Sequence, residues 1–553
     1  MIKLINNLKK KNFSFIFIIL IPIISFVGSI YQLNQHYDGH HHGIIYSITQ
    51  DFLDQKKIYK DFMPQYGISF ILINSFFLKL FSFSSLGIYF VTSIFYAVSF
   101  ILLRIIVKSL IDNEIANLSV CIMFLTHPYV GMPWSDYHFF FFLLLSLVFV
   151  LKINNHIHQF ISGFFLSIAA LEKDSFLFII LFLSFFIFFF QLFLFKFKKN
   201  NFFSIYWLMG FLFPIISFIY IIYLNDLLDN YKINLNFGIL LSKNNNINNN
   251  FNYIYFLLES FVLVIINLLK LSLINFFTEP YWFFFLLIIL TNFFYILYFA
   301  FYLTFRDNKS FVIFFISLLS ISLVFVNSYG LTVQRLVTGS FVGIITFLFL
   351  FNKFFSLENK SILSLVFVFF LLLGFKFVRS SNNLILPNYH KKYYQNPTVF
   401  KFLENKKLTK YEWEQLYSIE NLSNNISKYC NFIEHSTNLT NDIYFRIILK
   451  KNFKVLNYFP YHNGNLEFSN LMFKYFDPNY IINLHNLINR NSIIILASDK
   501  VDIQNYIPPD SNYYLYDTIK YYGYGMNFIK IYIPTNCNIK KNDHNLITVS
   551  TVK

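Results

Sequence analysis

Long apolar stretches alternate with short polar loops along the first two thirds of the chain. Each stretch is close to the roughly 20 residues that a helix needs to cross a hydrocarbon core of about 30 Å. The pattern therefore predicts a polytopic α-helical membrane protein with about 11–13 transmembrane helices. Thirteen candidate spans can be placed, at residues 13–32, 67–83, 86–108, 114–130, 137–152, 157–171, 176–195, 203–224, 253–277, 281–304, 310–328, 332–351 and 361–378.

A different pattern begins after residue 378, where turn formers, tyrosines and mixed charge replace the apolar runs. We expect two domains, a transmembrane domain over residues 1–378 and a soluble domain over residues 379–553. Within the second, short apolar runs predict strands and amphipathic runs predict helices, which together indicate a mixed α/β fold. The predicted strands are 491–497, 528–533 and 546–552, and the predicted helices are 396–408 and 410–419.

Composition agrees with a membrane protein. Only 13% of the 553 residues are charged, and 78 are phenylalanine, with a mean hydropathy of +0.52. The net charge of +16 is spread over short loops and the tail, so it indicates membrane flanks and no nucleic acid. Lysines precede the first span at 9–11, which predicts a retained anchor with a cytoplasmic amino end and an external first loop.

The three cysteines, Cys121, Cys430 and Cys537, have no metal-binding or redox spacing. A disulfide between Cys430 and Cys537 in an oxidising compartment is one option that the spacing leaves open.

The first loop is unusually polar for a chain of this composition. It holds Asp38 and four histidines, at 36 and 40–42. Ionisable groups beside a bilayer are costly, so this cluster points to an enzyme or a transporter of a polar ligand. Residues 43–53 then form an amphipathic pattern, which predicts a helix lying on the membrane surface. Pro64 and Gly67 end that segment before the next span.

This order of parts resembles the GT-C integral-membrane glycosyltransferases, which include protein O-mannosyltransferases and lipid A aminoarabinose transferases. Asp38 matches the acid of their first external loop, residues 57–61 match their Tyr-x-Asp turn, and Tyr66-Gly67 stands where many have Tyr-Gly-Pro. Three later segments also resemble the family. They are 128–136, which ends in the acid Asp136, the turn Leu171-Glu172-Lys173-Asp174, and the pair Gln334-Arg335.

The resemblance implies a glycosyl transfer from a polyprenyl-phosphate sugar. Asp38 would be the catalytic base that takes the acceptor proton. Lys173 and Arg335 would neutralise the donor phosphate. The remaining expected substrate contacts are His36, His40, Asp61, Tyr66, Asp136 and Glu172.

Each assignment has a structural alternative. Asp38 could be a solvated loop acid, and Asp61 could brace its turn. Asp136 could stabilise the start of the next helix through the helix dipole. Lys173 and Arg335 could extend their charged ends to the membrane–water interface. The three consecutive histidines, 40–42, could be interfacial residues, sugar contacts or ligands of a divalent cation, so the metal requirement stays open.

Strict alternation of the spans conflicts with these roles. Three candidate spans separate the external Asp38 loop from Asp136, which would place Asp136 in the cytoplasm and the lysines of 196–199 outside. One segment within 67–130 that does not cross fully would remove the conflict. A second such segment within 203–277 would place Arg335 and the tail outside.

The sequence therefore predicts a multi-pass glycosyltransferase of a bacterial inner membrane, with its active site and C-terminal domain facing the exterior. Its expected partners are the polyprenyl-phosphate sugar and a glycan, lipid or protein acceptor. A transporter or flippase of a lipid-linked saccharide is the main alternative. A non-catalytic receptor or envelope assembly protein, in which the tail is the working part, is the third.

Overall fold

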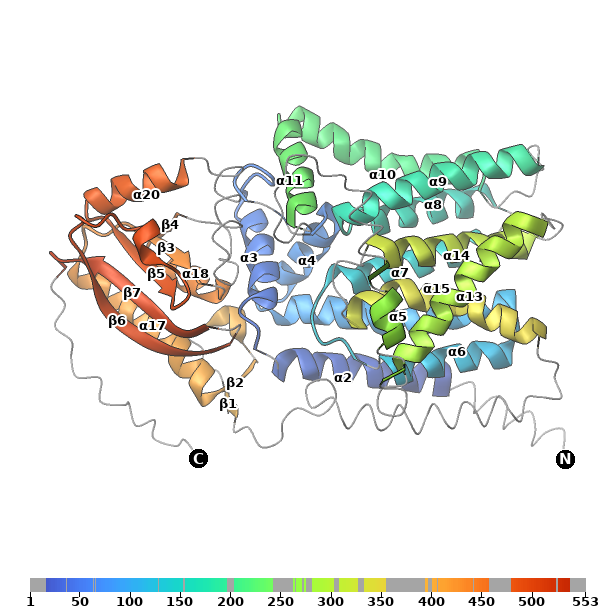
Figure 1. Ribbon diagram of the computed structural model, residues 1–553, viewed down its shortest axis with the longest axis horizontal. Helices are drawn as coiled ribbons and strands as arrows, with labels where there is room; N and C mark the ends of the chain where they lie inside the picture. Colours follow the sequence, from blue (N-terminus) through green and yellow to red (C-terminus); the bar gives the residue numbers. More distant parts are fainter. Residues whose placement is uncertain are drawn as a thin grey trace. The chain divides into compact units, whose positions relative to one another are not determined.

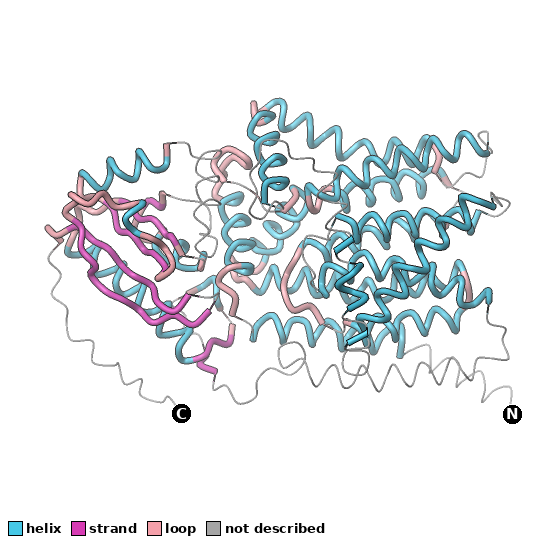
Figure 2. Tube along the Cα trace, in the orientation of Figure 1, coloured by secondary structure: helices cyan, strands magenta, loops and turns pink. Residues whose placement is uncertain are grey.

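The chain forms two compact units in the computed structural model. The first comprises residues 1–36, 52–391 and 397–405, and the second comprises 37–51, 392–396 and 406–553. Figure 2 shows that the first is helical and that the large sheet belongs to the second. The structure describes residues 16–35, 37–62, 64, 66–127, 129–152, 155–195, 203–241, 262–263, 265–270, 273–274, 281–302, 308–326, 333–354, 393–395, 400–404, 406–440, 442–456, 479–523 and 526–537.

Eleven of the predicted spans coincide with described helices of the first unit (Figure 1). Predicted span 361–378 lies outside the described residues, and so does most of 253–277. An additional helix, α11 (Leu228–Leu241), was not predicted. The eleven are a π-helical turn (Ile16–Leu20) continued by α2 (Ile21–Gln35), α4 (Ile68–Leu80), α5 (Leu86–Leu110), α6 (Asn113–Thr126), α7 (Ser135–Val150), α8 (His156–Ala170), α9 (Asp174–Phe195), α10 (Ile205–Leu224), α13 (Tyr281–Tyr302), α14 (Asn308–Val326) and α15 (Val333–Phe354).

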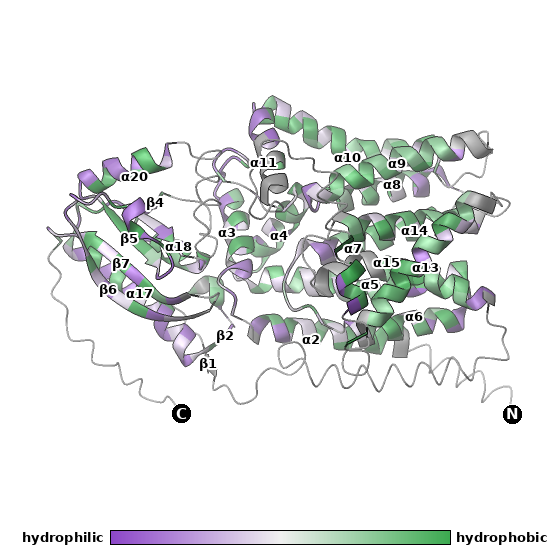
Figure 3. Ribbon diagram, viewed as in Figure 1, coloured by the Kyte–Doolittle hydropathy of each residue, from purple (hydrophilic) through white to green (hydrophobic). Residues whose placement is uncertain are grey.

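These helices make the chain a multi-pass membrane protein. Among the described residues, four helical segments are both long and apolar enough to cross a bilayer, in α5, α9, α10 and α13. Figure 3 shows their hydrophobic residues running along most of each helix. Helices α4 and α6 have 13 and 14 residues, or about 20 Å at 1.5 Å per residue. Each is shorter than a hydrocarbon core of about 30 Å.

Close helix packing in the first unit depends on small residues. Helix α8 packs against α7 and α10. A Cβ added to Gly163 of α8 would overlap the backbone of Trp207, and one added to Gly210 of α10 would overlap the backbone of Phe160. The two helices therefore approach backbone to backbone, as small residues permit in membrane proteins.

The second unit is built on a five-stranded mixed sheet in the order β4-β3-β5-β7-β6. Strand β3 pairs in parallel with β4 and β5, while β7 pairs antiparallel with β5 and β6. All six residues of the central β5 are buried, which explains its continuous apolar sequence. The strands are β3 (His435–Leu439), β4 (Lys454–Val455), β5 (Ile493–Ser498), β6 (Tyr513–Gly523) and β7 (Met526–Pro534).

Three helices accompany this sheet. Helix α20 (Tyr480–Asn489) packs its buried side chains on the face of β5 that carries Ile493 and Ile495. Helix α17 (Lys410–Tyr429) contacts β6, and α18 (Ile443–Leu449) contacts β3. The mixed α/β prediction for the tail is thus confirmed.

The individual elements of the tail were predicted unevenly. Strands 491–497 and 528–533 are confirmed by β5 and β7, and helix 410–419 is confirmed by α17, whereas 546–552 lies outside the described residues. The helix predicted over 396–408 is wrong. Its described residues form a short 3-10 helix (Lys401–Leu403) and strand β2 (Lys407–Thr409), which pairs antiparallel with β1 (Tyr393–Gln395). Helix α17 cannot extend into this region because Thr409 and Glu412 form a capping box at its start.

Residues Tyr37–Asp51 of the first loop belong to the second unit. They include most of α3 (His41–Leu53), which confirms the predicted helix. Its polar side is buried as well as its apolar side, and its predicted place on a membrane surface stays a prediction. Ser47 is 5% exposed and Asp51 is 2% exposed. The boundary predicted at residues 378 and 379 lies outside the described residues.

A disulfide joins Cys430, at the end of α17, to Cys537, after β7. Their Cα atoms are 5.5 Å apart, a normal separation for the bond. Cys121 is a free thiol in α6.

Candidate active site

Asp38 is completely buried in the second unit. One of its carboxylate oxygens accepts a hydrogen bond of 2.7 Å from the backbone N–H of His41, in the first turn of α3. The other lies 2.9 Å from Nδ1 of the same histidine. Asp38 is therefore not a solvated loop acid. A carboxylate has about four lone-pair positions, so an oxygen bonded in this way can still take a proton from an acceptor.

The neighbouring histidines have different surroundings. The ring of His40 packs edge-on against the ring of His41, with centroids 4.8 Å apart. Nδ1 of His42 lies 2.9 Å from Nζ of Lys406. Burial lowers the pKa of the Lys406 ammonium to about 7, and the charges of Asp38 and Glu412 oppose that decrease. Lys406 is not predicted from the sequence, because no residue near it marks a contact with a residue 364 positions away.

We expect the stability of the second unit to rise with pH because of Lys406. Between pH 7 and its ordinary pKa of 10.5, an unfolded chain binds the lysine proton and the folded chain does not. The unfolding free energy must then increase with pH across that window. Thermal unfolding between pH 7 and 9.5 should show this slope in the wild type and a flatter one in Lys406→Met. Lys410→Met, at a half-exposed lysine that pairs with Glu414, should keep the wild-type slope.

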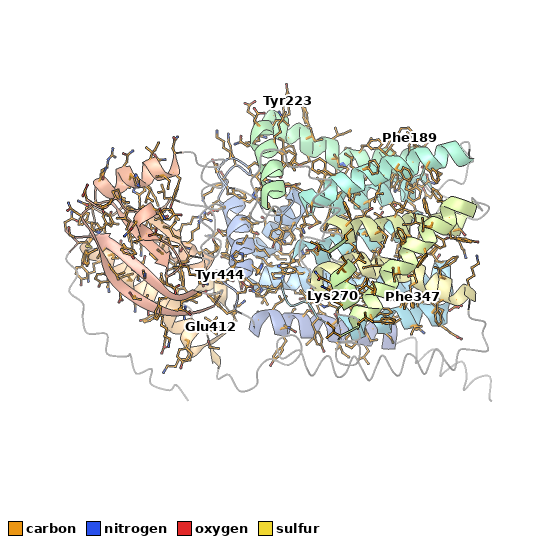
Figure 4. All side chains as sticks on the ribbon, in the orientation of Figure 1. Phe189, Tyr223, Lys270, Phe347, Glu412 and Tyr444 are labelled. Carbon is orange, nitrogen blue, oxygen red and sulfur yellow. A yellow bond between two sulfur atoms is a disulfide. The ribbon has the colours of Figure 1, made fainter. Side chains whose placement is uncertain are left out.

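A buried ion pair fixes α3 to α18. Arg446 donates hydrogen bonds of 2.8 Å to Asp51 and 2.6 Å to Ser47. Lys450 lies 3.2 Å from the other oxygen of Asp51. The catalytic candidate Asp38 therefore lies on a segment that the C-terminal part of the chain holds by charge. Figure 4 labels Tyr444 on α18, the helix that carries Arg446 and ends just before Lys450.

The first unit brings together two other segments that the sequence pattern indicates. The backbone N–H of Gly67 donates to the carbonyl of Glu172 at 2.8 Å, and Ser69 donates to Leu171 at 3.1 Å. A Cβ on Gly67 would overlap the Leu171 carbonyl. This close approach explains the glycine after Tyr66, and it joins the start of α4 to the turn between α8 and α9.

Glu172 and His138 form the centre of this cluster. Both are completely buried, and Oε2 of Glu172 lies 3.7 Å from Nδ1 of His138. Within the described part of the chain, neither oxygen of Glu172 has a hydrogen-bond partner. Burial raises the pKa of this carboxyl well above its ordinary value. His138 was not predicted, although it stands two residues after Asp136. Its Nε2 lies 3.1 Å from Oγ1 of Thr92.

Asp136 lies in the first turn of α7 and is 4% exposed. The N-cap of this helix is Trp134, so Asp136 is not the capping residue, but its place in the first turn is the one that the helix-dipole alternative predicts. Its Oδ1 has no hydrogen-bond partner among the described residues. Asp136 and His138 thus bring a carboxylate and an imidazole to the same end of α7.

The remaining predicted residues divide into three groups. Asp61 accepts a hydrogen bond of 2.7 Å from the backbone N–H of Lys57, as the turn-bracing alternative predicts. Lys173 places its ammonium 5.0 Å from the ring centre of Phe176. Arg335 lies in the first turn of α15, and its side chain lies outside the described structure, as does His36.

The described residues contain no group of three or more His, Cys, Asp or Glu side chains arranged to hold a metal ion. His41 faces Asp38, whereas His42 faces Lys406.

Neither a protein-family model nor a curated protein sequence matches the chain. Solved structures do match. Superposition on ArnT from Cupriavidus metallidurans bound to undecaprenyl phosphate gives a TM-score of 0.54 at 8% identity, over 94% of this chain and 98% of ArnT. The oligosaccharyltransferase AglB from Archaeoglobus fulgidus, in complex with an inhibitory peptide and a dolichol-phosphate, gives 0.45 at 12% identity, over 86% of this chain and 69% of AglB. The fold assignment rests on ArnT, and it shows that this chain shares the fold of that protein.

Proposed function

We propose that the protein is a glycosyltransferase that moves a sugar from a polyprenyl-phosphate donor to an acceptor outside the cytoplasm. The observation that carries the proposal is the buried Asp38 carboxylate in the first loop of a chain with the ArnT fold. The ArnT structure was bound to undecaprenyl phosphate, which supports a lipid phosphate as the donor carrier. The acceptor is a glycan, a lipid or a protein.

The proposed reaction needs one base and a cation for the leaving group. The acceptor hydroxyl or amine attacks the anomeric carbon, and its proton passes to the Asp38 carboxylate. The bond between that carbon and the phosphate oxygen breaks, and the electron pair leaves with the phosphate. Lys173 and Arg335 are proposed to bind this phosphate. Asp136, Glu172, Tyr66 and the first-loop histidines His36 and His40 are proposed as substrate contacts.

We also propose that the active site and C-terminal domain face the periplasm of a bacterial inner membrane. The disulfide between Cys430 and Cys537 supports this side, because such bonds persist in oxidising compartments. Helix α4, the shorter of the two short helices in this region at 13 residues, supports the suggestion that one segment within 67–130 does not cross fully. With one such segment, Asp38 and Asp136 fall on the same side of the membrane.

A transfer assay tests the function directly. Purified protein in lipid nanodiscs would receive radiolabelled undecaprenyl-phosphate hexoses and pentoses, with membrane extract as the source of acceptor. Release of undecaprenyl phosphate together with a labelled product supports the proposal. Movement of a labelled lipid across a vesicle without release of phosphate would instead identify a flippase. An absence of both would favour the assembly protein.

Lys173→Ala should weaken the binding of undecaprenyl phosphate by about 10–100-fold, because hydrogen bonds to charged groups contribute about 1.5–3 kcal/mol. The KM for the acceptor should stay near the wild-type value. Lys152→Ala is a matched control, because Lys152 also lies over an aromatic ring, 5.6 Å from the centre of Phe149. Binding can be measured by isothermal titration in nanodiscs. Equal affinity for undecaprenyl phosphate in Lys173→Ala and Lys152→Ala would show that Lys173 only extends to the membrane–water interface.

A further inference from the structure

A second buried carboxylate in the same unit contacts the residues on both sides of Asp38. Asp442 is completely buried at the start of α18, where its Oδ1 accepts a hydrogen bond of 2.9 Å from the backbone N–H of Tyr444. Its Oδ2 accepts hydrogen bonds from the hydroxyl of Tyr37 at 2.6 Å and from that of Tyr521 at 2.9 Å. Tyr37 directly precedes Asp38.

Gly39, which directly follows Asp38, is held by the same residues. The backbone N–H of Ile443 donates to the carbonyl of Gly39 at 2.9 Å. A Cβ on Gly39 would overlap the Asp442 carboxylate, so the carboxylate lies against the glycine backbone. Asp38 is thus the central residue of a three-residue segment that is fixed at each end by Asp442 or its neighbour.

A capping role alone does not explain this residue. Asn and Asp cap helices about equally well, and an uncharged Asn would avoid the cost of burying an anion. Burial raises the pKa of Asp442 to about 6, a shift that hydrogen bonds from Tyr37, Tyr521 and Tyr444 oppose and the charge of Asp38 increases. Among the described residues, the second oxygen accepts from two tyrosine hydroxyls, and one of these lies 405 residues away in the first loop.

We propose that Asp442 is a positioning residue for the proposed base Asp38. Residues from the C-terminal part of the chain thereby take part in catalysis. This inference rests on the proposed function. General bases act only within hydrogen-bond reach of the proton, so a displacement of about 1 Å can lower a rate by about 100-fold. Asp442 does not touch the substrate. It fixes where the Asp38 carboxylate is held.

The test compares Asp442→Asn and Tyr37→Phe in the wild-type and Asp38→Asn backgrounds. Asp502→Asn is the matched control, because Asp502 caps an exposed 3-10 helix (Ile503–Asn505) in the same unit. Asp442→Asn should lower kcat by about 10–100-fold, with KM values for donor and acceptor within about twofold of wild type. In the Asp38→Asn background it should cause no further loss, because a residue that acts through Asp38 has nothing left to position.

Hydrogen exchange provides a readout that does not depend on activity. Amides of residues 37–46 should exchange faster in Asp442→Asn than in Asp502→Asn or in the wild type. Unchanged exchange would overturn the positioning role, whatever the assay shows. Multiplicative losses of kcat in the double variant, or a lower melting temperature with normal kcat, would also overturn it. A wild-type protein without transfer activity would instead remove the proposed function, and the exchange data would still decide whether Asp442 holds the segment.

Discussion

Asp38→Asn should lower turnover by about 10²–10⁴-fold, the range typical of a lost general base. The amide has the size of the carboxylate, and its oxygen can still accept the backbone N–H of His41. The protein should therefore fold normally while losing the group that takes the acceptor proton. Release of undecaprenyl phosphate per mole of folded enzyme is the quantity to measure.

The chain offers a control with the same local geometry. Asp112 caps α6 by accepting a 2.8 Å hydrogen bond from the backbone N–H three residues later, just as Asp38 does. Asp112→Asn should keep wild-type turnover, because Asn is an equally good cap. Asp38→Glu should restore little activity, since one more methylene moves the carboxylate away from its position. Near-normal turnover in Asp38→Asn would remove the assignment of the base.

The membrane helices could be predicted from sequence because their signal is local. A run of about 20 apolar residues marks a helix without any knowledge of its neighbours, and residues 176–195 are such a run. Helix α11 was missed because its residues mix Asp, Asn and Lys with apolar side chains and form no such run. The false helix at 396–408 arose from its alternation of apolar and charged residues, which resembles an amphipathic run, whereas the strand pairing of β2 depends on a partner elsewhere in the chain.

The candidate site was predictable in part. The resemblance selected Tyr66-Gly67 and Leu171-Glu172-Lys173, and the structure joins these two segments through backbone hydrogen bonds. The surroundings of Asp38 could not be predicted, because they come from residues about 400 positions away. One signal was available. Arg446 is the only charged residue in the seven-residue apolar helix α18, and a charge in such a setting is rarely buried without a partner.

The pair of Arg446 with Asp51 leads to a prediction about stability. Asp51→Leu should destabilise the C-terminal unit by about 3–5 kcal/mol, because it leaves a buried cation without its anion. Arg446 is only 4% exposed, and Lys450 would then face it without the carboxylate that now lies between them. Urea titration with pulse proteolysis of a C-terminally tagged protein measures the loss. Lys410→Met, which breaks an exposed pair with Glu414, should change the unfolding free energy by less than about 1 kcal/mol.

Adding Arg446→Met to Asp51→Leu should restore stability even though it removes a second native side chain. Apolar residues that replace both members of a buried ion pair are often as stable as the pair itself, because neither charge then needs to be desolvated. Lys450 is 31% exposed and can turn towards solvent once its partner is gone. The double variant should therefore be more stable than Asp51→Leu alone and should recover more than half of the loss. If the losses of unfolding free energy from the two substitutions simply added, the ion pair would contribute little. Packing of Ile44, Ile45 and Ile48 would then hold α3 in place.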